Sequence, residues 1–348
     1  MPLMMNDGRI PARWAEKKNM SPRSARERYG NSTECLKIAL VNNMPDPALE
    51  DTELQFFELL DTASGEVPVL IKLYSLPEIV RSDRAQLHLS SHYFGIRDLL
   101  DTKFDGVIIT GTEPRQRNLR DEPYWRTLTE VFDWAERNTS SAILSCLAAH
   151  ASVLHSDQID RRPLADKQFG VFDYKNSGSH PLANGAAATV RFPHSRWNEL
   201  RADQLTSCGY SLVTQSAEAG VDLFVKNKNQ SLFVHFQGHP EYFGNTLLKE
   251  YRRDIRRFLN HERETYPCMP LGYFDADATK LLDEFRRSAQ AHRQEDLIEI
   301  FPENAVADTL QNTWQSSAVH IYRNWLQHLV SKKIGASLVP ATVRAGVR

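Results

Sequence analysis

Residues 141–155, SAILSCLAAHASVLH, join an apolar run typical of a buried strand to an alanine-rich run typical of a helix. Cys146 lies at the junction between the two runs. The free amide groups at a helix N-terminus favour an anion and lower the pKa of a thiol, so a cysteine in this place can be a nucleophile. A cysteine among apolar residues is more often a small buried hydrophobe, and this stretch alone favours that second interpretation.

The same alternation of strand and helix precedes this stretch. Residues 37–43, KIALVNN, have the composition of a buried strand, and residues 48–63 repeat apolar side chains at helical spacing. Further strand-like runs lie at 67–76 and 105–112, and further helix-like runs lie at 94–102 and 123–138. Strands that alternate with helices predict an α/β fold with a doubly wound, mostly parallel sheet.

The pattern changes beyond Gln158. Shorter β-like runs follow, with Gly, Asn and Ser between them, at 169–174, 186–192, 210–216 and 222–227. We expect these runs to extend the main sheet with antiparallel strands. A last strand at 231–237 leads into an amphipathic helix at 245–263, which more helical segments follow. The expected domains are an N-terminal arm at 1–34, one large domain at 35–333 and a loosely ordered tail at 334–348.

The composition excludes several classes of protein. The 348 residues are 41% hydrophobic and 25% charged, and 42 basic against 44 acidic side chains leave a formal net charge of -2. This balance offers no electrostatic basis for binding nucleic acid or an anionic membrane surface, so small-molecule ligands or protein partners are expected. No run approaches the roughly 18 continuous apolar residues of a membrane span, and export is not expected. The oligomeric state stays open, with a homodimer among the options.

The cysteines give no sign of cross-linking or metal binding. Cys35, Cys146, Cys208 and Cys268 are far apart in the sequence, without a CxxC pair or a metal-like Cys/His spacing. Neither a disulfide framework nor a metal site is therefore predicted. A reducing cytoplasm suits such a protein best.

Unusual residues follow three of the predicted strands, and an open parallel sheet places functional groups at the carboxyl ends of its strands. Gly111 allows close backbone approach to a ligand, where amides can donate to an oxyanion. Cys146 follows the next strand, and His239 and Glu241 follow the last one. Together they predict a triad in which the imidazole takes the thiol proton and the carboxylate fixes its tautomer. Each part alone is weak, since a lone HxE is usually a surface pair.

The chain also resembles a family, the homoserine O-acyltransferases of methionine biosynthesis, which share the class I glutamine amidotransferase fold. The motifs that carry the resemblance keep their order from about residue 37 to residue 332: NNMPD, TELQFFELL, FDGVIITG, YW, the cysteine turn, FGVFDY, PHSRW, GHPEY, YRRD and NWL. The resemblance implies that residues 35–333 are an acyltransferase domain in which Cys146 accepts the acyl group, His239 is the base and Glu241 orients that base. It also implies that the substrate is bound by Lys167, Ser195 and Arg253.

The expected reaction has two halves. Cys146 attacks the thioester of an acyl-CoA, while backbone N–H groups of Leu147 and of Gly111 or Thr112 stabilise the oxyanion. Coenzyme A leaves, and an amino acid with a hydroxyl side chain, its carboxylate held by Arg253, then takes the acyl group by ping-pong kinetics. Acyl-CoA is thus a co-substrate, and no bound cofactor is expected. The resemblance favours homoserine as the acceptor, and serine stays open because one methylene contributes only about 1–3 kcal/mol of discrimination.

Three features depart from related proteins. Leu144 and Ala148 occupy the positions that are glycines in a G-x-C-x-G amidotransferase elbow, so a glutamine amidotransferase-like hydrolase is the weaker alternative. Asp46 and Pro47 follow the MP dipeptide, where the acyltransferase family usually has a lysine. After ITG, the position where a glycine accompanies succinyl-CoA and a glutamate accompanies acetyl-CoA holds Arg115.

The residue at this last position decides the donor by charge. An arginine can pair with the succinyl carboxylate through two parallel hydrogen bonds, so succinyl-CoA is the predicted donor. Acetyl-CoA stays open if the bulk of Arg115 fills the pocket instead. A further hypothesis is a regulatory protein that kept the fold and lost the reaction, against which the intact triad residues argue.

Overall fold

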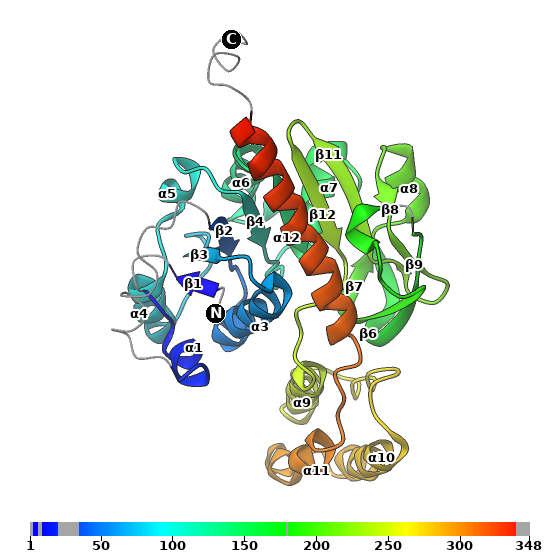
Figure 1. Ribbon diagram of the computed structural model, residues 1–348. Coiled ribbons are helices and arrows are strands. Elements are labelled where there is room, and N and C mark those ends of the chain that lie inside the picture. The colour runs from blue at the N-terminus through cyan, green and yellow to red at the C-terminus, as the bar shows by residue number, and fades with distance from the viewer. Residues whose placement is uncertain (1–2, 6–8, 20–34, 179, 339–348) are drawn as a thin grey trace.

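An eight-stranded sheet forms the centre of the computed structural model, which describes residues 3–5, 9–19, 35–178 and 180–338 (Figure 1). The strand order is β1-β3-β2-β4-β5-β12-β11-β8. The strands are β1 (Leu3–Met5), β2 (Leu36–Val41), β3 (Val69–Tyr74), β4 (Gly106–Ile109), β5 (Ser141–Ser145), β8 (Ser211–Leu212), β11 (Leu223–Lys228) and β12 (Ser231–Phe236). All neighbours from β1 to β12 are parallel, and β11 and β8 are antiparallel. The order β3-β2-β4-β5-β12 is that of a doubly wound, flavodoxin-like sheet, as predicted.

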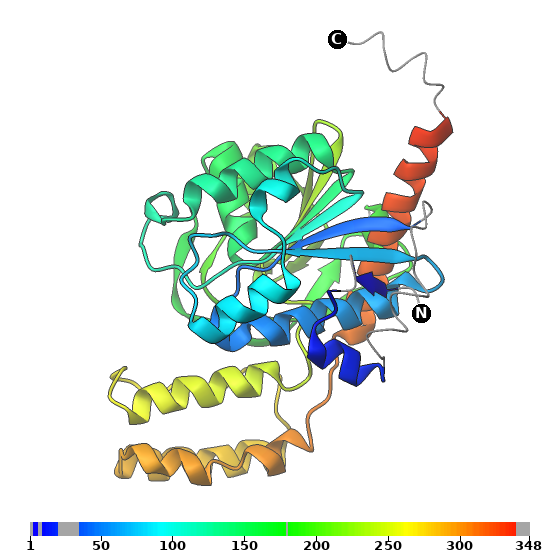
Figure 2. The same cartoon turned by 90° about the vertical axis from the view of Figure 1, so that its left-hand side faces the viewer.

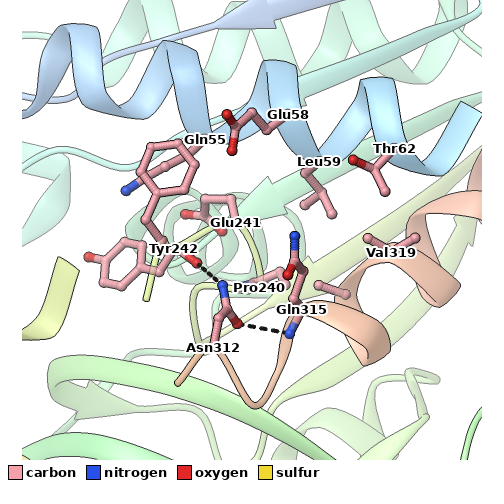
Figure 3. Close-up of a pocket in the computed structure, with 12 residues that line it drawn as sticks. Gln55, Glu58, Leu59, Thr62, Pro240, Glu241, Tyr242, Asn312, Gln315 and Val319 are labelled. Atoms are coloured by element: carbon pink, nitrogen blue, oxygen red, sulfur yellow. Dashed lines mark hydrogen bonds between the residues drawn. The ribbon is translucent and has the colours of Figure 1, made fainter. Parts of the chain in front are cut away.

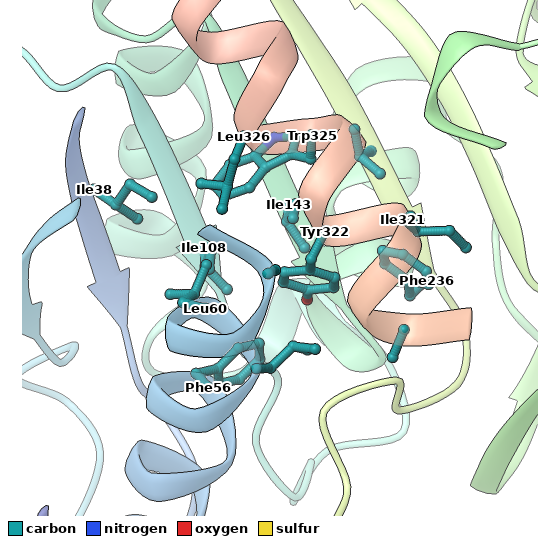
Figure 4. Packing of buried hydrophobic residues seen from close by; sticks show 14 of the residues in the cluster. Ile38, Phe56, Leu60, Ile108, Ile143, Phe236, Ile321, Tyr322, Trp325 and Leu326 are labelled. Carbon is teal, nitrogen blue, oxygen red and sulfur yellow. The ribbon is translucent and has the colours of Figure 1, made fainter. Parts of the chain in front are cut away.

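Side chains of the parallel strands alternate between two apolar layers. On β2, Ile38 and Leu40 belong to one buried cluster, while Ala39 and Val41 belong to the other. The first cluster is covered by α3 (Asp46–Ser64) and by α12 (Gln315–Leu338), which crosses the sheet diagonally in Figure 1. Figure 4 shows aromatic and aliphatic side chains of both helices packed onto the strands.

The opposite layer contains the helices that connect the parallel strands. They are α5 (Ile96–Leu100), α6 (Trp125–Asn138) and α7 (Leu147–Asp157), while α4 (Asp83–His92) contributes Ala85 to the first layer. Because both faces are covered, the strands are mostly apolar, as β4 with its sequence GVII illustrates.

A second sheet corrects part of the sequence prediction. The runs at 169–174 and 186–192 do not extend the main sheet, because β6 (Arg162–Asn176) and β7 (Thr189–Glu199) form their own antiparallel sheet. Its order is β10-β9-β6-β7, with β9 (Thr214–Ser216) and β10 (Gly220–Val221). Only β8 and β11 are antiparallel additions to the main sheet. The short helix α8 (Ala202–Ser207) lies between β7 and β8 in the chain.

A helical layer lies beyond the carboxyl ends of the strands, at the bottom of Figures 1 and 2. It contains α9 (Thr246–Leu259), α10 (Ala276–Ala291) and α11 (Glu303–Ala307). Their apolar faces share one cluster, to which Tyr251, Leu282 and Trp314 contribute. Short 3₁₀ turns occur at Leu119–Asp121, Pro181–Ala183 and Glu295–Ile300. The helical layer brings α9 next to the ends of β6 and β7.

Parts of both terminal regions belong to the fold. β1 pairs with β3, and α1 (Ala12–Lys17) packs on α3 with the rings of Trp14 and Phe57 5.5 Å apart. Residues 20–34 of the expected arm and 339–348 of the expected tail lie outside the described residues, whereas α12 continues to Leu338. Among the helices in the described part of the chain, none has the length and apolarity to cross a membrane.

Candidate active site

Cys146 lies at a sharp turn between β5 and α7. Its φ of 52° and ψ of -112° place it in a region that non-glycine residues rarely adopt, and it is the N-cap residue of α7. The turn is fastened by a hydrogen bond of 2.8 Å from its backbone N–H to the carbonyl of Phe236, at the end of β12. Such a strained strand-to-helix turn presents its side chain at the edge of the sheet, as a nucleophile elbow does.

His239 and Glu241 complete the predicted triad. His239 Nδ1 lies 2.9 Å from Glu241 Oε1, and Cys146 is close enough to act electrostatically on the His239 ring. Both residues are only 6% exposed. Burial alone would lower the pKa of His239, but Cys146 and Glu241 raise it well above its usual value. The raised pKa of His239 therefore favours the protonated imidazole.

The backbone around His239 is fixed from the second sheet. The N–H of Gly238 donates to Asp222 Oδ1 at 2.6 Å, and the N–H of His239 donates to the carbonyl of Pro193 at 2.9 Å. A Cβ on Gly238 would lie 2.7 Å from the His194 ring, so only glycine fits there. Burial raises the pKa of Asp222 to about 7.

Gly111 and Leu147, two residues of the predicted oxyanion site, are in close contact. A Cβ on Gly111 would lie 2.7 Å from Leu147 Cβ and 2.9 Å from Leu147 N, so the missing side chain lets the two backbone segments touch. The loop after β4 is also tied to the loop after β2, because Asn43 N donates to Thr110 Oγ1 at 2.8 Å. Thr112 follows as a half-buried residue. The predicted donors thus lie beside the nucleophile.

A cluster of charged and polar side chains lies next to the triad. It comprises Lys167, Ser195, Glu250, Arg253 and Asp254, and we call it the acceptor cluster. Lys167 Nζ lies 3.0 Å from Asp254 Oδ2, and Arg253 Nη2 lies 3.0 Å from Asp254 Oδ1. The hydroxyl of Ser195 donates to Glu250 Oε2. The sequence prediction brought three of these residues to one substrate site, and the structure does place them together, on β6, β7 and α9.

One aromatic residue joins the acceptor cluster to the triad. The ring of Tyr242 stacks on the His239 ring with centroids 4.2 Å apart, and its hydroxyl donates to Glu250 Oε1 at 2.7 Å. The sequence analysis did not single out Tyr242, Glu250, Asp254 or Asp222. Tyr242 lies in the GHPEY motif and Asp254 lies in the YRRD motif, so the motifs could have indicated both residues. No pattern in the sequence indicated Asp222.

A cavity of about 30 Å³ lies beside Glu241, large enough for about one small molecule the size of water. Figure 3 shows Glu241 and Tyr242 at its wall, opposite Gln55 of α3 and close to Asn312. Asn312 Nδ2 donates to the carbonyl of Tyr242 at 3.4 Å. The cavity is too small to hold a substrate. Its walls are formed by α3, by the segment that contains Glu241 and by the start of α12.

Comparison with known proteins identifies the family of this chain. The family model for homoserine O-succinyltransferase matches residues 2–336. The chain belongs to this family. A homoserine O-succinyltransferase from Rhodopseudomonas palustris is 44% identical over 297 residues, which are 85% of this chain and 89% of that protein. Another, from Methylorubrum extorquens, is 43% identical over 301 residues, which are 86% of this chain and 88% of that protein.

A solved structure of a glutamine amidotransferase from Thermotoga maritima is also similar, with a TM-score of 0.45 and 9% identity over 85% of this chain and 98% of that one. In this member of the homoserine O-succinyltransferase family, the two elbow positions that are glycines in an amidotransferase carry packed side chains. Leu144 and Ala148 are both almost fully buried in the apolar layer around α6 and α7. The predicted family resemblance is confirmed.

The two departures from the homoserine O-succinyltransferase pattern have local explanations. Asp46 begins α3 and accepts hydrogen bonds from Ser82 N at 2.8 Å and from Arg81 Nη1 at 3.2 Å. Asp46 is thus paired with Arg81 and fixed to the start of α4. The side chain of Arg115 is exposed, and its backbone N–H donates to Glu122 Oε1 at 2.5 Å. The loop that carries Arg115 is thus anchored by its backbone.

Proposed function

We propose that this protein transfers a succinyl group from succinyl-CoA to the hydroxyl of homoserine through an acyl-enzyme on Cys146. The observation that carries the proposal is the arrangement of Cys146, His239 and Glu241 at the strand ends, with Glu241 hydrogen-bonded to His239, in a chain that belongs to the homoserine O-succinyltransferase family. A cysteine nucleophile must remain a free thiol, which suits the reducing cytoplasm. Acyl-CoA enters as a co-substrate and leaves as free coenzyme A.

The first half-reaction acylates the cysteine. The Cys146 thiolate attacks the thioester carbon, and the N–H groups of Leu147 and of Gly111 or Thr112 stabilise the oxyanion. When the bond to the coenzyme A sulfur breaks, the imidazolium of His239 supplies a proton to the leaving thiolate. His239 is then neutral and ready to act as a base.

The second half-reaction transfers the acyl group. His239 removes the proton from the acceptor hydroxyl, whose oxygen attacks the acyl-enzyme, and Cys146 leaves as a thiolate. A free amino acid carries one positive and one negative group, and the acceptor cluster offers both complementary charges. We assign the acceptor carboxylate to Arg253 and Lys167 and its ammonium group to Glu250, with Ser195 beside them.

The test is mass spectrometry of the intact protein after incubation with succinyl-CoA or acetyl-CoA. We expect one succinyl group on Cys146, and its loss when homoserine is added. Serine in place of homoserine tests the acceptor, and a mass change with acetyl-CoA alone would contradict the succinyl donor. Release of glutamate from glutamine would instead favour the amidotransferase alternative, against which the buried Leu144 and Ala148 argue. No mass change with either donor would favour a protein that has lost the reaction.

A further inference from the structure

Tyr242 belongs to a tight turn that folds its ring back onto the ring of His239. The N–H of Tyr242 donates to the carbonyl of His239 at 3.1 Å, and Pro240 is the second residue of this four-residue turn. The two rings stack with their centroids 4.2 Å apart and an angle of 16° between their planes. Glu241 engages Nδ1 of the imidazole at 2.9 Å, which leaves Nε2 for the substrate. Glu241 thus fixes the imidazole within its plane, and Tyr242 fixes the plane itself.

The backbone of Tyr242 is held by the segment that precedes α12. Its carbonyl accepts hydrogen bonds from Trp314 Nε1 at 2.9 Å and from Asn312 Nδ2 at 3.4 Å, and the second of these is drawn in Figure 3. Tyr242 is buried, and Trp314 is buried completely. The ring therefore has little freedom to leave the imidazole, and the hydroxyl at its far end has a fixed position as well.

The hydroxyl of Tyr242 contacts Glu250, to which we assign the ammonium group of the acceptor. It donates to Glu250 Oε1 at 2.7 Å, and burial together with this carboxylate raises the pKa of Tyr242 well above its usual value, so the hydroxyl keeps its proton. The other oxygen, Oε2, accepts from the Ser195 hydroxyl and lies 3.9 Å from Lys167 Nζ and 4.0 Å from Arg253 Nη2. A carboxylate oxygen has two lone pairs, so Oε1 can accept a further hydrogen bond from an ammonium group.

We propose that Tyr242 is a positioning residue for the second half-reaction, because one side chain aligns the base with the group that binds the acceptor ammonium. This inference rests on the proposed function. An acceptor amino acid contacts Glu250 through its ammonium group and His239 through its hydroxyl at the same time. The ring and the hydroxyl of Tyr242 fix the distance between these two contacts, and fast transfer requires such a fixed geometry. The ring serves both half-reactions, whereas the hydroxyl serves only the acceptor.

The experiment removes the hydroxyl and keeps the ring, in Tyr242→Phe. The acyl-enzyme is formed with succinyl-CoA and freed of excess donor, and its loss of the succinyl group is followed at several acceptor concentrations. The acceptors are homoserine and 4-hydroxybutyrate, which has the same hydroxyl and carboxylate and lacks the ammonium group. Hydrolysis without any acceptor gives a second reference that involves no ammonium group.

Tyr273→Phe is the matched control, because it also removes a buried tyrosine hydroxyl near α9. That hydroxyl donates to the carbonyl of Gly244 at 2.5 Å and accepts from the N–H of Leu248 at 3.3 Å, so it contacts backbone groups instead of the acceptor cluster. A general loss of packing or stability should affect both variants alike.

Tyr242→Phe is expected to lower the second-order rate constant for deacylation by homoserine by about 10- to 100-fold, as the loss of a hydrogen bond to a charged group predicts. Deacylation by 4-hydroxybutyrate, hydrolysis without acceptor and the burst of coenzyme A release should each stay within about threefold of the unchanged protein, because the ring still holds the imidazole. Tyr273→Phe should not discriminate between the two acceptors.

Other outcomes would overturn the assignment. An equal loss with both acceptors and in hydrolysis would mean that the hydroxyl supports the base or the fold instead of ammonium binding. Unchanged deacylation by homoserine would mean that Glu250 is positioned without Tyr242. If the unchanged protein is not succinylated on Cys146, the proposed function fails, whereas a succinylated protein in which Tyr242→Phe behaves like the unchanged chain refutes this inference alone.

Discussion

The triad and the acceptor cluster are neighbours that are built in opposite ways. Cys146, His239 and Glu241 follow the ends of β5 and β12, two adjacent parallel strands whose pairing fixes where the chain emerges. The acceptor cluster combines side chains from β6, β7 and α9, and long charged side chains meet there across three elements. The triad is therefore positioned by backbone, and the acceptor cluster by charge pairing.

The difference also appears in solvent exposure. The triad residues His239 and Glu241 are buried, whereas the side chain of Arg253 is 47% exposed although it contacts the buried Asp254. Buried groups act strongly on each other, and half-exposed ion pairs are screened by water. Changes in the triad should consequently remove the chemistry, while changes in the acceptor cluster should mainly alter affinity.

The largest expected effect is that of Cys146→Ala, which removes the nucleophile. We expect acyl transfer to fall by about 10⁴-fold or more, because no other group can form the acyl-enzyme. The fold should persist, as circular dichroism can check, since the side chain contributes little to the apolar clusters. Cys208→Ala is the matched control. In the unchanged protein, iodoacetamide and peptide mapping should find Cys146 labelled first, and equal labelling of Cys208 and Cys268 would contradict its role.

Glu241→Gln tests whether the carboxylate tunes the imidazole. Glu241 and Cys146 raise the pKa of His239, so removing the carboxylate should lower this pKa. The imidazolium that protonates the leaving thiolate would then be lost at a lower pH, and the alkaline limb of the pH profile should move toward neutral pH. We also expect a loss of about 10²-fold or more in kcat. Exposed Glu218→Gln is the control, and an unmoved profile would argue for a purely structural role.

Asp222→Asn tests the buried acid that accepts a hydrogen bond from Gly238, the residue before His239. Burial raises the pKa of Asp222 to about 7, so the folded protein holds a proton that the unfolded chain releases near pH 4. Stability from this group should thus decline as the pH rises from 4 to 7, and the asparagine variant should lack that decline. From pH 4 to pH 7, the free energy of unfolding of the variant should therefore rise by about 1–4 kcal/mol relative to that of the unchanged protein. Urea unfolding at pH 4 and pH 7 measures the free energy of unfolding, with exposed Asp166→Asn as the control. The same pH dependence in Asp222→Asn and the unchanged protein would contradict the prediction.

Arg253→Ala should separate recognition from chemistry. Because the guanidinium is half-exposed, we expect a loss of about 1–2 kcal/mol, or roughly tenfold in the KM for homoserine. The burst of coenzyme A release from the donor should stay unchanged. Arg256→Ala, on the exposed face of the same helix, serves as the control. An unchanged KM for homoserine would assign Arg253 to the solvated face of α9.

Arg115→Glu should have the smallest effect, because its side chain faces solvent. We expect a shift of donor preference from succinyl-CoA toward acetyl-CoA by no more than about threefold, since water screens exposed charges. Turnover with both donors in the unchanged protein and the variant measures it. A larger shift would show that Arg115 contributes to donor selection, and no shift would show that Arg115 does not contact the acyl group.

The sequence by itself determined the parallel sheet and the position of Cys146, the proposed nucleophile, at a strand-to-helix turn. Short apolar runs that alternate with segments of helical periodicity predict an α/β fold. The carboxyl ends of its parallel strands must meet at one edge of the sheet. This is why Cys146, His239 and Glu241 could be combined before their distances were known. The family resemblance added Lys167 and Arg253, which no local pattern distinguishes from other surface cations.

Only the tertiary structure decided which charges are paired and which are left without a partner. Strand pairing is non-local, so the runs that become β6 and β7 could not be assigned to a separate sheet from their composition. The same limit hid Asp222, because its burial and its hydrogen bond from Gly238 N depend on residues far apart in the chain. Burial and ion pairing depend on residues far apart in the chain. They decide the protonation state of each side chain and the groups that it contacts.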